Sequence, residues 1–236
     1  KRLNQLADSL FLPITFVFSS SGLINQHLPV LSKELNAYIS TFSSKYSIDD
    51  ITGYLEKMRP LKVLTIGEAI IDEYNYCTAM GKSSKEPMLV VKCSSTEKFA
   101  GGILAVGNNM AGFSDNVSIL SFLGDTDSHE EFVRANLKST VKAQFLTRHD
   151  SPTIVKKRFI ESYFFHKLLA VYSINDSEMT KADNSAFCST LEQIVPGFDV
   201  VVVVDFGHSI LTPEAAQVIC NKAKFLAVNT QSNAGS

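Results

Sequence analysis

The sequence lacks the paired cysteines and closely spaced histidines that mark metal sites. Its four cysteines, Cys77, Cys93, Cys188 and Cys220, form no CxxC motif, and none stands at metal-ligand spacing from a histidine. The five histidines show no HxH or HxxxH spacing, so we expect no metal site. Scattered cysteines are typical of reduced thiols, which predicts a cytoplasmic protein.

Long apolar runs and an excess of charge of one sign are also missing. The run around Val200–Val204 is bounded by Asp199 and Asp205 and is far shorter than the roughly 20 residues of a membrane span. Residues 1–10 read as a polar segment rather than a signal peptide. The net charge is −2, and no stripe of Lys and Arg stands out. We therefore expect no membrane span and no nucleic-acid partner.

Motifs for covalent nucleophiles and dinucleotides are absent too. No GxSxG or Cys–His arrangement occurs, and KFAGGILAVGNNMAGF (98–113) spaces its glycines unlike a Rossmann fingerprint or a P-loop. Gly101 and Gly102 stand where a helix would begin, so their N–H groups could meet an anion or a hydroxyl; a tight turn with close packing explains them equally well. Close packing and helix termination account for Gly107 and Gly112.

From Lys62 onward, strand and helix patterns alternate. A first strand begins at Lys62, and the further predictions are strands at 87–93, 117–124, 153–161, 167–174, 199–207 and 225–230 and helices at 128–137, 182–195 and 212–223. Ser128 with Glu131 predicts a capping box, and Thr212 before Pro213 predicts an N-cap. Residues 153–174 form a predicted hairpin. The alternation predicts an α/β fold with a mostly parallel sheet and helices on both faces.

The first sixty residues follow a different pattern. LPITFVF (12–18) predicts a strand, and residues 31–58 predict helices, the second of them capped by Ser47 with Asp50. Pro60 ends this region, so we place a boundary there. The chain starts without Met and ends at NTQSNAGS soon after a predicted strand, which predicts a fragment of a longer protein, truncated at its C-terminus.

Five polar residues near predicted strand ends are candidates for a site. Asp72 lies just beyond the first strand, and Asp205 and His208 follow a buried strand, where open parallel sheets bind ligands. Lys156 and Arg158 alternate along one strand, so they share a face and could hold a phosphorylated substrate. The alternatives are a solvated loop for Asp72, a turn for Asp205, a structural role for His208 and a solvated edge strand for the two cations.

The ordered motifs resemble a known family. VLTIGEAIIDEY, KSSKEPMLVVK, FAGGILAVGNNMA, VSILSFLGDTD, SPTIVKKRFI and VVVVDFGHSILT are similar to segments of the ribokinase-like (PfkB) carbohydrate kinases. The branch with the heptose-phosphate kinase domain of ADP-heptose synthesis enzymes matches best. The resemblance covers about three quarters of the chain.

This resemblance implies transfer of the γ-phosphoryl group of ATP to a sugar or sugar-phosphate hydroxyl, with ATP and Mg²⁺ as cofactors. It implies a small β lid around residues 88–92 that covers the site and joins two copies of the chain. It also implies the following substrate contacts: Asp72 on the sugar hydroxyls, Gly101 and Gly102 with their backbone at the sugar, and Lys156 and Arg158 at lid or substrate positions.

The sequence departs from the family pattern in three ways. Ala105 stands where the family usually has Asn, and His208 stands where the heptose branch tends to have Lys. No GxGD motif occurs, so we expect the general-base Asp and the anion hole beyond Ser236 and predict no kinase activity for this chain alone.

The N-terminal region has its own resemblance. FSSSGLINQ is similar to a segment near the end of cytidylyltransferase-like nucleotidyltransferase domains, with Ser19, Ser20 and Ser21 near the nucleotide phosphates; an ordinary Ser-rich loop is the alternative. We predict a nucleotidyltransferase tail at 1–30, a helical linker at 31–60 and a partial kinase domain at 61–236. The alternative functions are a non-catalytic binding or regulatory module and, disfavoured by the glycine spacing, a Rossmann-type oxidoreductase.

Overall fold

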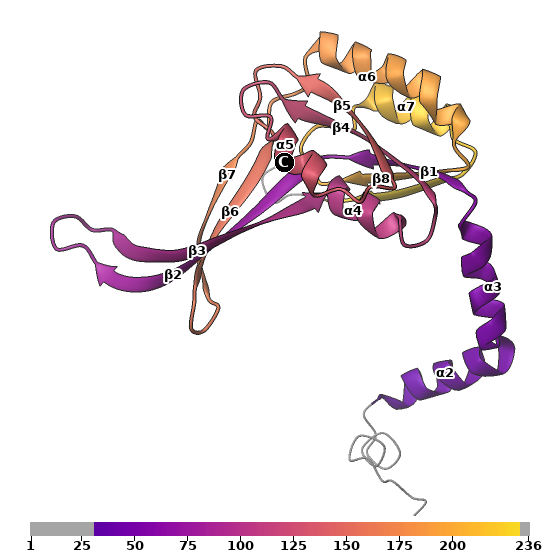
Figure 1. The fold of residues 1–236 in the computed structure, drawn as a ribbon, viewed down its shortest axis with the longest axis horizontal. Coiled ribbons are helices and arrows are strands. Elements are labelled where there is room, and N and C mark those ends of the chain that lie inside the picture. Colours follow the sequence, from indigo (N-terminus) through magenta and orange to yellow (C-terminus); the bar gives the residue numbers. More distant parts are fainter. Residues whose placement is uncertain (1–30, 232–236) are drawn as a thin grey trace, which may run out of the picture. The chain divides into compact units, whose positions relative to one another are not determined.

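The computed structural model describes residues 31–231 (Figure 1). The chain divides into two compact units, residues 1–53 and 54–236. The strand predicted at 12–18 and the three serines at 19–21 lie outside the described residues.

The described part of the first unit is helical. Helix α2 spans Lys33–Lys45, and α3, Ile48–Met58, begins in the first unit and ends in the second. The predicted capping box of α3 is confirmed: the Asp50 carboxylate accepts the Ser47 N–H at 2.9 Å, and the Ser47 hydroxyl accepts the Asp50 N–H at 3.1 Å. The helical prediction over 31–58 is therefore confirmed as two helices.

The second unit contains a parallel five-stranded sheet. Its strands are β1 (Lys62–Gly67), β4 (Asn116–Gly124), β5 (Val141–Arg148), β8 (Val200–Asp205) and β9 (Leu226–Thr230). They lie in the order β5-β4-β1-β8-β9, and every neighbouring pair is parallel. The predicted parallel sheet is confirmed, but the sequence did not predict β5.

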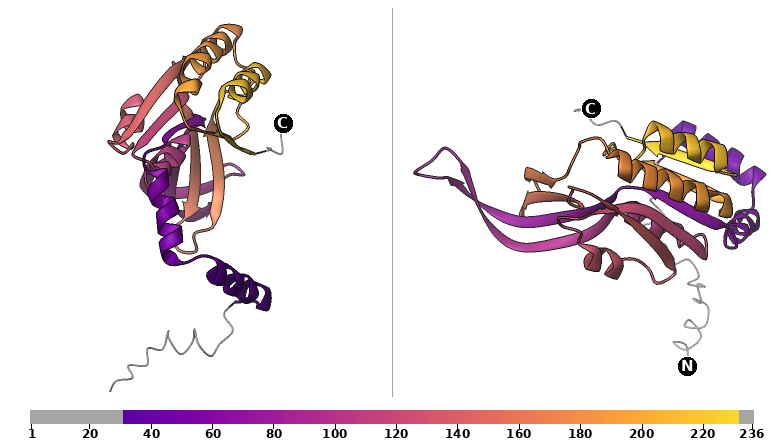
Figure 2. Two further views of the ribbon diagram at one scale, coloured as in Figure 1. Left: turned by 90° about the vertical axis from the view of Figure 1, so that its right-hand side faces the viewer. Right: turned by 90° about the horizontal axis from the view of Figure 1, so that it is seen from above.

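Helices cover both faces of this sheet, as predicted. Helices α4 (Ile103–Met110) and α5 (Glu130–Ala135) pack on one face, and α6 (Lys181–Ile194) and α7 (Pro213–Lys222) on the other. Successive residues of β1 serve the two cores in turn, since Val63 joins the α4 side and Leu64 the α6 side. Figure 2 shows α6 and α7 side by side over the sheet.

Two predictions of helix starts had different outcomes. The Thr212 hydroxyl accepts the Ala215 N–H at 3.1 Å and Pro213 is the first residue of α7, so this N-cap is confirmed. The capping box of Ser128 and Glu131 is wrong. In a capping box the Ser128 hydroxyl would accept the Glu131 N–H, but here it accepts the Glu130 N–H. The N-cap residue is His129, with φ of 50°, and the helix is shorter than predicted.

A second sheet, called the lid sheet here, projects from the carboxyl ends of the parallel strands (Figure 1). It contains β2 (Ala69–Lys82), β3 (Leu89–Gly102), β6 (Ile154–Glu161) and β7 (Lys167–Ser173), in the order β3-β2-β6-β7. Two antiparallel hairpins, β2–β3 and β6–β7, meet along the parallel pair β2–β6. The predicted hairpin at 153–174 is confirmed.

The first lid hairpin is longer than we predicted from the sequence. One residue, Glu68, separates β1 from β2, so the chain passes directly from the parallel sheet into a 14-residue lid strand. Strand β3 extends past the predicted 87–93 as far as Gly102, where α4 begins. No helix within residues 31–231 is both long and apolar enough to cross a membrane.

Gly124, at the end of β4, supports the first testable prediction. A Cβ there would collide with the backbone of Ser151, Pro152 and Thr153, which cannot rotate away as a side chain can. We expect Gly124→Ala to lower the free energy of unfolding by about 1–3 kcal/mol in urea titrations. Gly197→Ala is the matched control, because nothing lies within 4 Å of its added Cβ. Equal midpoints for the two variants would contradict the prediction.

Candidate functional site

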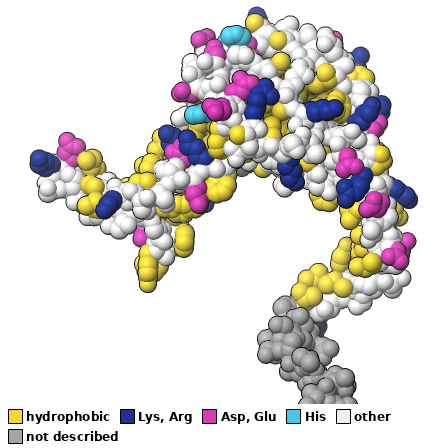
Figure 3. All heavy atoms as spheres, in the orientation of Figure 1, with side chains coloured by type: hydrophobic (Ala, Val, Ile, Leu, Met, Phe, Trp, Pro, Cys, Tyr) yellow, Lys and Arg dark blue, Asp and Glu magenta, His cyan; other side chains and the backbone are white. Residues whose placement is uncertain are grey.

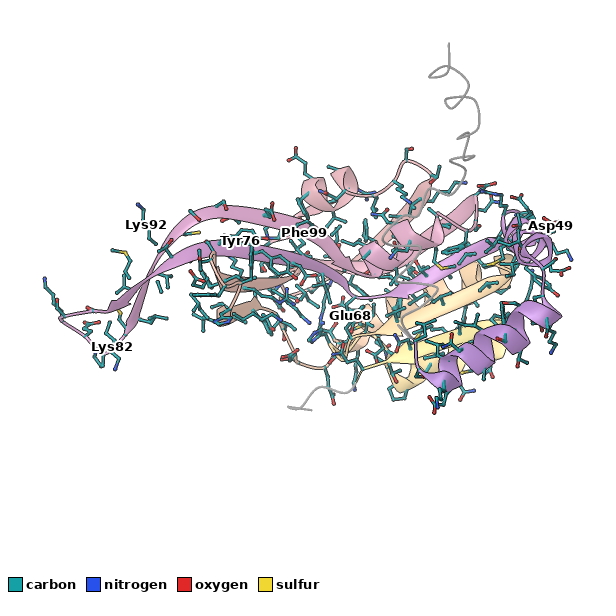
Figure 4. All side chains as sticks on the ribbon, turned by 90° about the horizontal axis from the view of Figure 1, so that it is seen from below. Asp49, Glu68, Tyr76, Lys82, Lys92 and Phe99 are labelled. Atoms are coloured by element: carbon teal, nitrogen blue, oxygen red, sulfur yellow. The ribbon has the colours of Figure 1, made fainter. Side chains whose placement is uncertain are left out.

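Glu68 joins three elements at the carboxyl end of the parallel sheet (Figure 4). The connections from β1 and β8 run to opposite sides of the sheet, so the gap between these strands is the topological switch point where such sheets bind ligands. The Glu68 carboxylate accepts the N–H of Phe206 and the N–H of His208, both at 2.9 Å. Its backbone carbonyl accepts the Ile103 N–H at 2.9 Å, at the start of α4.

Burial shifts the pKa values of the charged groups in this cluster. Glu68 is only 4% exposed, and burial raises the pKa of its carboxyl despite the two amide hydrogen bonds. Arg148, the last residue of β5, is also buried and donates to the carbonyls of His208 at 3.1 Å and Ser177 at 2.7 Å. Burial lowers the pKa of Arg148. Two amides and a guanidinium thus hold the loop after β8 in place.

His208 lies inside this cluster. Its Nδ1 is 3.2 Å from the Asp176 carboxylate, and its buried Nε2 has no hydrogen-bond partner among residues 31–231. Burial, followed by the nearby charge of Lys156, lowers the pKa of His208, so the ring is neutral at neutral pH. A cavity of about 30 Å³, enough for one water molecule, lies between Glu68, Arg148 and His208.

Asp205 is the last residue of β8. Its carboxylate accepts the N–H of Gly207, whose φ is 76°, at 2.9 Å. This hydrogen bond matches the turn role that the sequence left open for Asp205. This hydrogen bond uses one of the two carboxylate oxygens. The role of Asp205 in binding a ligand stays a prediction.

The lid sheet presents a charged and aromatic face. Asp72 lies within β2, opposite Phe99 of β3, because the chain enters a second sheet at Ala69. The alternative of a solvated loop for Asp72 is therefore wrong. Its carboxylate forms an ion pair with the Arg158 guanidinium, which also lies 5.4 Å from the centroid of the Tyr74 ring. About a fifth of each partner of the ion pair is exposed, so the pair is accessible to a ligand.

Lys156 and Arg158 share this face, as predicted. Lys156 pairs in register with Asp72, and its ammonium lies 5.6 Å from the centroid of the Tyr172 ring. Lys157 points the other way, with its ammonium 3.9 Å from Glu73. Strand β6 lies between β2 and β7, so the alternative of a solvated edge strand is wrong. Burial lowers the pKa of Lys156.

Gly101 and Gly102 lie between the buried group around Glu68 and the charged face of the lid sheet. A Cβ on Gly101 would collide with the Asp72 carboxylate, and a Cβ on Gly102, whose φ is 55°, would collide with the Glu68 carbonyl. Gly102 therefore requires glycine, because its backbone is left-handed and the colliding atom is a backbone carbonyl. At Gly101 a Cβ would displace the Asp72 carboxylate from its position. Gly107 packs against Ile119, which confirms its packing role.

The structure brings the predicted residues into two adjacent groups. Asp72, Gly101, Lys156 and Arg158 form the lid group; Gly102, Asp205 and His208 form the group at the sheet edge. The serines at 19–21 lie outside the described residues. The sequence analysis did not identify Glu68 and Arg148. Glu68 directly follows the first strand, so the rule that ligands bind at the carboxyl ends of parallel strands could have identified it, as it did Asp205. Within residues 31–231, no three His, Cys, Asp or Glu side chains gather as metal ligands.

The comparisons with known proteins agree with this architecture. No family model matches the chain. A bifunctional protein HldE of Campylobacter jejuni subsp. doylei is 27% identical over 175 residues, which are 74% of this chain and 36% of that protein. The HldE protein of Pasteurella multocida is 25% identical over 158 residues, 67% of this chain and 32% of that protein. This chain thus spans about a third of the curated relatives that it matches.

Solved structures show the same fold. A candidate 1-phosphofructokinase of Thermotoga maritima superposes with a TM-score of 0.52 at 15% identity, over 71% of this chain and 53% of that one. A candidate sugar kinase of Clostridium perfringens gives a TM-score of 0.51 at 16% identity, over 74% and 52%. The chain is thus similar in sequence to the bifunctional HldE proteins and shares the fold of these two solved structures, which agrees with the resemblance of its motifs from Lys62 onward.

The buried Glu68 carboxyl leads to a prediction on pH. Its pKa in the folded state is raised above the ordinary 4.5, so the stability that it contributes is fully present below that pH and is lost as pH rises through the folded pKa. Glu68→Gln removes this titration and one acceptor. We expect the variant to be less stable than the wild type at low pH and the difference to shrink toward neutral pH in urea titrations. A difference that is constant or grows with pH would contradict the prediction.

Proposed function

We propose that this chain is the sugar-kinase part of a bifunctional kinase and nucleotidyltransferase for nucleotide-sugar synthesis, and that it transfers a phosphoryl group from ATP to a hydroxyl of a sugar or sugar phosphate. Its relation to HldE proteins and its carbohydrate-kinase fold support this function. The observation that carries it is the Asp72 carboxylate beside Gly101, where the lid sheet meets the carboxyl edge of the parallel sheet.

We assign the sugar to the lid group. The Asp72 carboxylate accepts hydrogen bonds from sugar hydroxyls, and Arg158 orients it. Since Gly101 and Gly102 have no side chains, the sugar approaches the backbone there. The cations of Lys156 and Arg158 suit an anionic substituent, which favours a sugar phosphate over a neutral sugar.

We assign the phosphates of ATP to the sheet edge. The end of β8, with Asp205 and His208, is on the side of the switch point where nucleotides bind in such sheets. Magnesium commonly uses one or two carboxylates and the phosphates of its substrate. Asp205 offers one carboxylate, in keeping with the lack of a three-ligand group among residues 31–231. The general base implied beyond Ser236, and the inactivity of this chain alone, stay predictions.

The domain assignments are part of the proposal. Residues 1–30, with Ser19, Ser20 and Ser21, would be the end of the nucleotidyltransferase domain. Residues 31–60 would link it to a kinase domain at 61–236. The relatives' description as bifunctional proteins supports a second domain beside the kinase, and the order of the domains is part of the proposal.

A second candidate function is a non-catalytic sugar- or nucleotide-binding module. Ala105 lies in the first turn of α4, three residues after Gly102, and its methyl group cannot hydrogen-bond a sugar hydroxyl. His208 is buried and neutral where the branch tends to have a cation. These two positions favour binding without transfer.

Substrate turnover decides between the two functions. We expect the protein that carries this chain to release ADP from ATP and Mg²⁺ only when a sugar or sugar phosphate from a test panel is added. Sugar phosphate binding by calorimetry without ADP release would support the binding module instead. No binding of any panel member would contradict both functions.

Asp72 provides the most direct test of the sugar site. We expect Asp72→Asn to weaken sugar binding at least tenfold, about 1.4 kcal/mol, because the amide is a poorer acceptor and no longer pairs with Arg158. ATP affinity should stay unchanged. Asp115→Asn is the matched control, because Asp115 pairs with Arg59 at 3.5 Å on an exposed surface. Equal sugar affinity in both variants, measured by calorimetry, would contradict the site.

The lid sheet is also the surface that we propose for a homodimer. Large apolar side chains are exposed along it, and Figure 3 shows hydrophobic groups gathered on the lid. They include Met80, Met88, Leu89, Tyr163, Phe164, Phe165, Leu169 and Val171. Exposed apolar surface of this extent is typical of an interaction site.

Sedimentation equilibrium tests the dimer. We expect a concentration-dependent dimer that the double change Phe164→Ser and Phe165→Ser weakens at least tenfold, because both rings are two-thirds exposed in the β6–β7 turn. Phe225→Ser, at a similarly exposed position away from the lid, should leave the association constant unchanged. A monomer at all concentrations would contradict the proposal.

A further inference from the structure

Two of the four cysteines meet across the lid. Cys77 of β2 lies opposite Cys93 of β3 in the antiparallel register, although sixteen positions separate them in the sequence (93 − 77 = 16). Residues directly opposite each other on antiparallel strands point to the same face of the sheet. The two thiols therefore lie next to each other, while all four cysteines are reduced in this structure.

The backbone geometry at this pair suits a disulfide. The Cys77 carbonyl accepts the N–H of Ser162 at 2.9 Å and its hydroxyl at 3.1 Å, so the polar backbone groups of Cys77 face β6 rather than β3. Cys77 and Cys93 thus form a non-hydrogen-bonded pair, in which Cα atoms are about 4.5 Å apart. This separation lies within the range of about 4.4–6.8 Å found in disulfides.

A bulge holds the pair in this register. Tyr76 pairs with Ser95, so Ser94 is the extra residue of β3. The Ser94 hydroxyl donates to the Tyr76 carbonyl at 2.9 Å, which fixes the bulge on its two sides. Figure 4 labels Tyr76 and Lys92, which directly precede the two cysteines.

The two thiols differ in access to solvent. Cys93 is exposed, and its sulfur lies 3.5 Å from the Ser95 carbonyl and 3.9 Å from the Thr96 hydroxyl. Cys77 is completely buried and continues the series of buried residues Glu73, Asn75 and Cys77 on the face of β2 that points away from Asp72. Burial, and then the neighbouring Cys93 thiol, raise the pKa of Cys77. An oxidant in solution therefore reaches Cys93 first.

We propose that Cys77 and Cys93 form a redox-active pair, which a low-molecular-weight disulfide such as oxidised glutathione converts into a disulfide across β2 and β3. The Cys93 thiol loses its proton, and its sulfur attacks one sulfur of glutathione disulfide, which breaks that bond and releases one glutathione. The Cys77 thiol then loses its proton, and its sulfur displaces the second glutathione from Cys93. The protein loses two protons and two electrons, and glutathione disulfide gains them as two thiols.

This disulfide would act on the lid sheet. It lies between the inner part of the hairpin, which carries Asp72 and Phe99, and the outer part, which ends at the turn of residues 83–88. A covalent bond at the bulge fixes the register of the outer strands. The inference depends on the register of two strands and not on the proposed kinase function.

Peptide mapping after thiol blocking tests the pair. The full chain is equilibrated in glutathione buffers of increasing oxidised fraction, blocked with N-ethylmaleimide and digested without reductant. We expect a peptide that joins Cys77 to Cys93, an intact mass lower by two hydrogens, and loss of maleimide from these two cysteines. Cys188 and Cys220 should keep their maleimide in the linked molecules. Dithiothreitol should restore both blocked thiols.

Single variants distinguish a specific disulfide between Cys77 and Cys93 from unspecific oxidation of cysteines. Cys93→Ser should abolish the link, and Cys77→Ser should leave Cys93 with one bound glutathione. Cys188→Ser and Cys220→Ser are the matched controls and should form the link normally. Because a serine at the buried position 77 can disturb folding, Cys77→Ala is used as well, with circular dichroism to verify the fold. A link between any other two cysteines, or no link in any buffer, would overturn the proposal.

Discussion

One buried residue, Glu68, holds the two sheets and the start of α4 in a fixed relation through its carboxylate and its backbone carbonyl. Glu68 is the sole residue between β1 and β2, and its side chain accepts two backbone amides from the loop after β8. A buried acceptor with several charge-assisted hydrogen bonds is costly to disturb, because the amides would lose their partners as well. The loop that carries His208 is therefore fixed relative to the strand that enters the lid.

This constraint explains how the candidate site is assembled from distant segments. The chain leaves the parallel sheet through Glu68, forms the first lid hairpin and returns at Gly101 and Gly102, directly beside its point of departure. Ala69 pairs with Gly102 in register, so the entry and exit of the hairpin are adjacent. The absence of side chains at the return point lets the backbone of Gly101 and Gly102 lie in close contact with the Asp72 carboxylate and the Glu68 carbonyl.

The sequence predicted the parts of the fold with strong periodic signals. The apolar run Val200–Val204 and the segment 117–124 form the predicted inner strands, and α7 has the N-cap that Thr212 before Pro213 predicted. Strand β2 has no such signal: its first residues are apolar throughout, and its last five are exposed on both faces, so neither a helical nor a strand period appears. The ion pair of Asp72 and Arg158 joins residues 86 positions apart, and the contact of Cys77 with Cys93 depends on a one-residue bulge. Spacing within a sequence does not encode either contact.

Under the proposed function, the charges on the lid would link substrate binding to the position of the lid. Arg158 occupies one oxygen of Asp72, and a carboxylate with about four lone-pair sites can accept a sugar hydroxyl without releasing the guanidinium. Arg158 comes from β6 and Asp72 from β2, so the ion pair adds to the parallel contact that joins the two lid hairpins. A sugar that binds Asp72 therefore binds a carboxylate already oriented by the second hairpin. Under the proposed function, loss of Arg158 would disorder the carboxylate and weaken the joint between the hairpins in one step, which makes the pair a structural element of the lid as well as part of the sugar site.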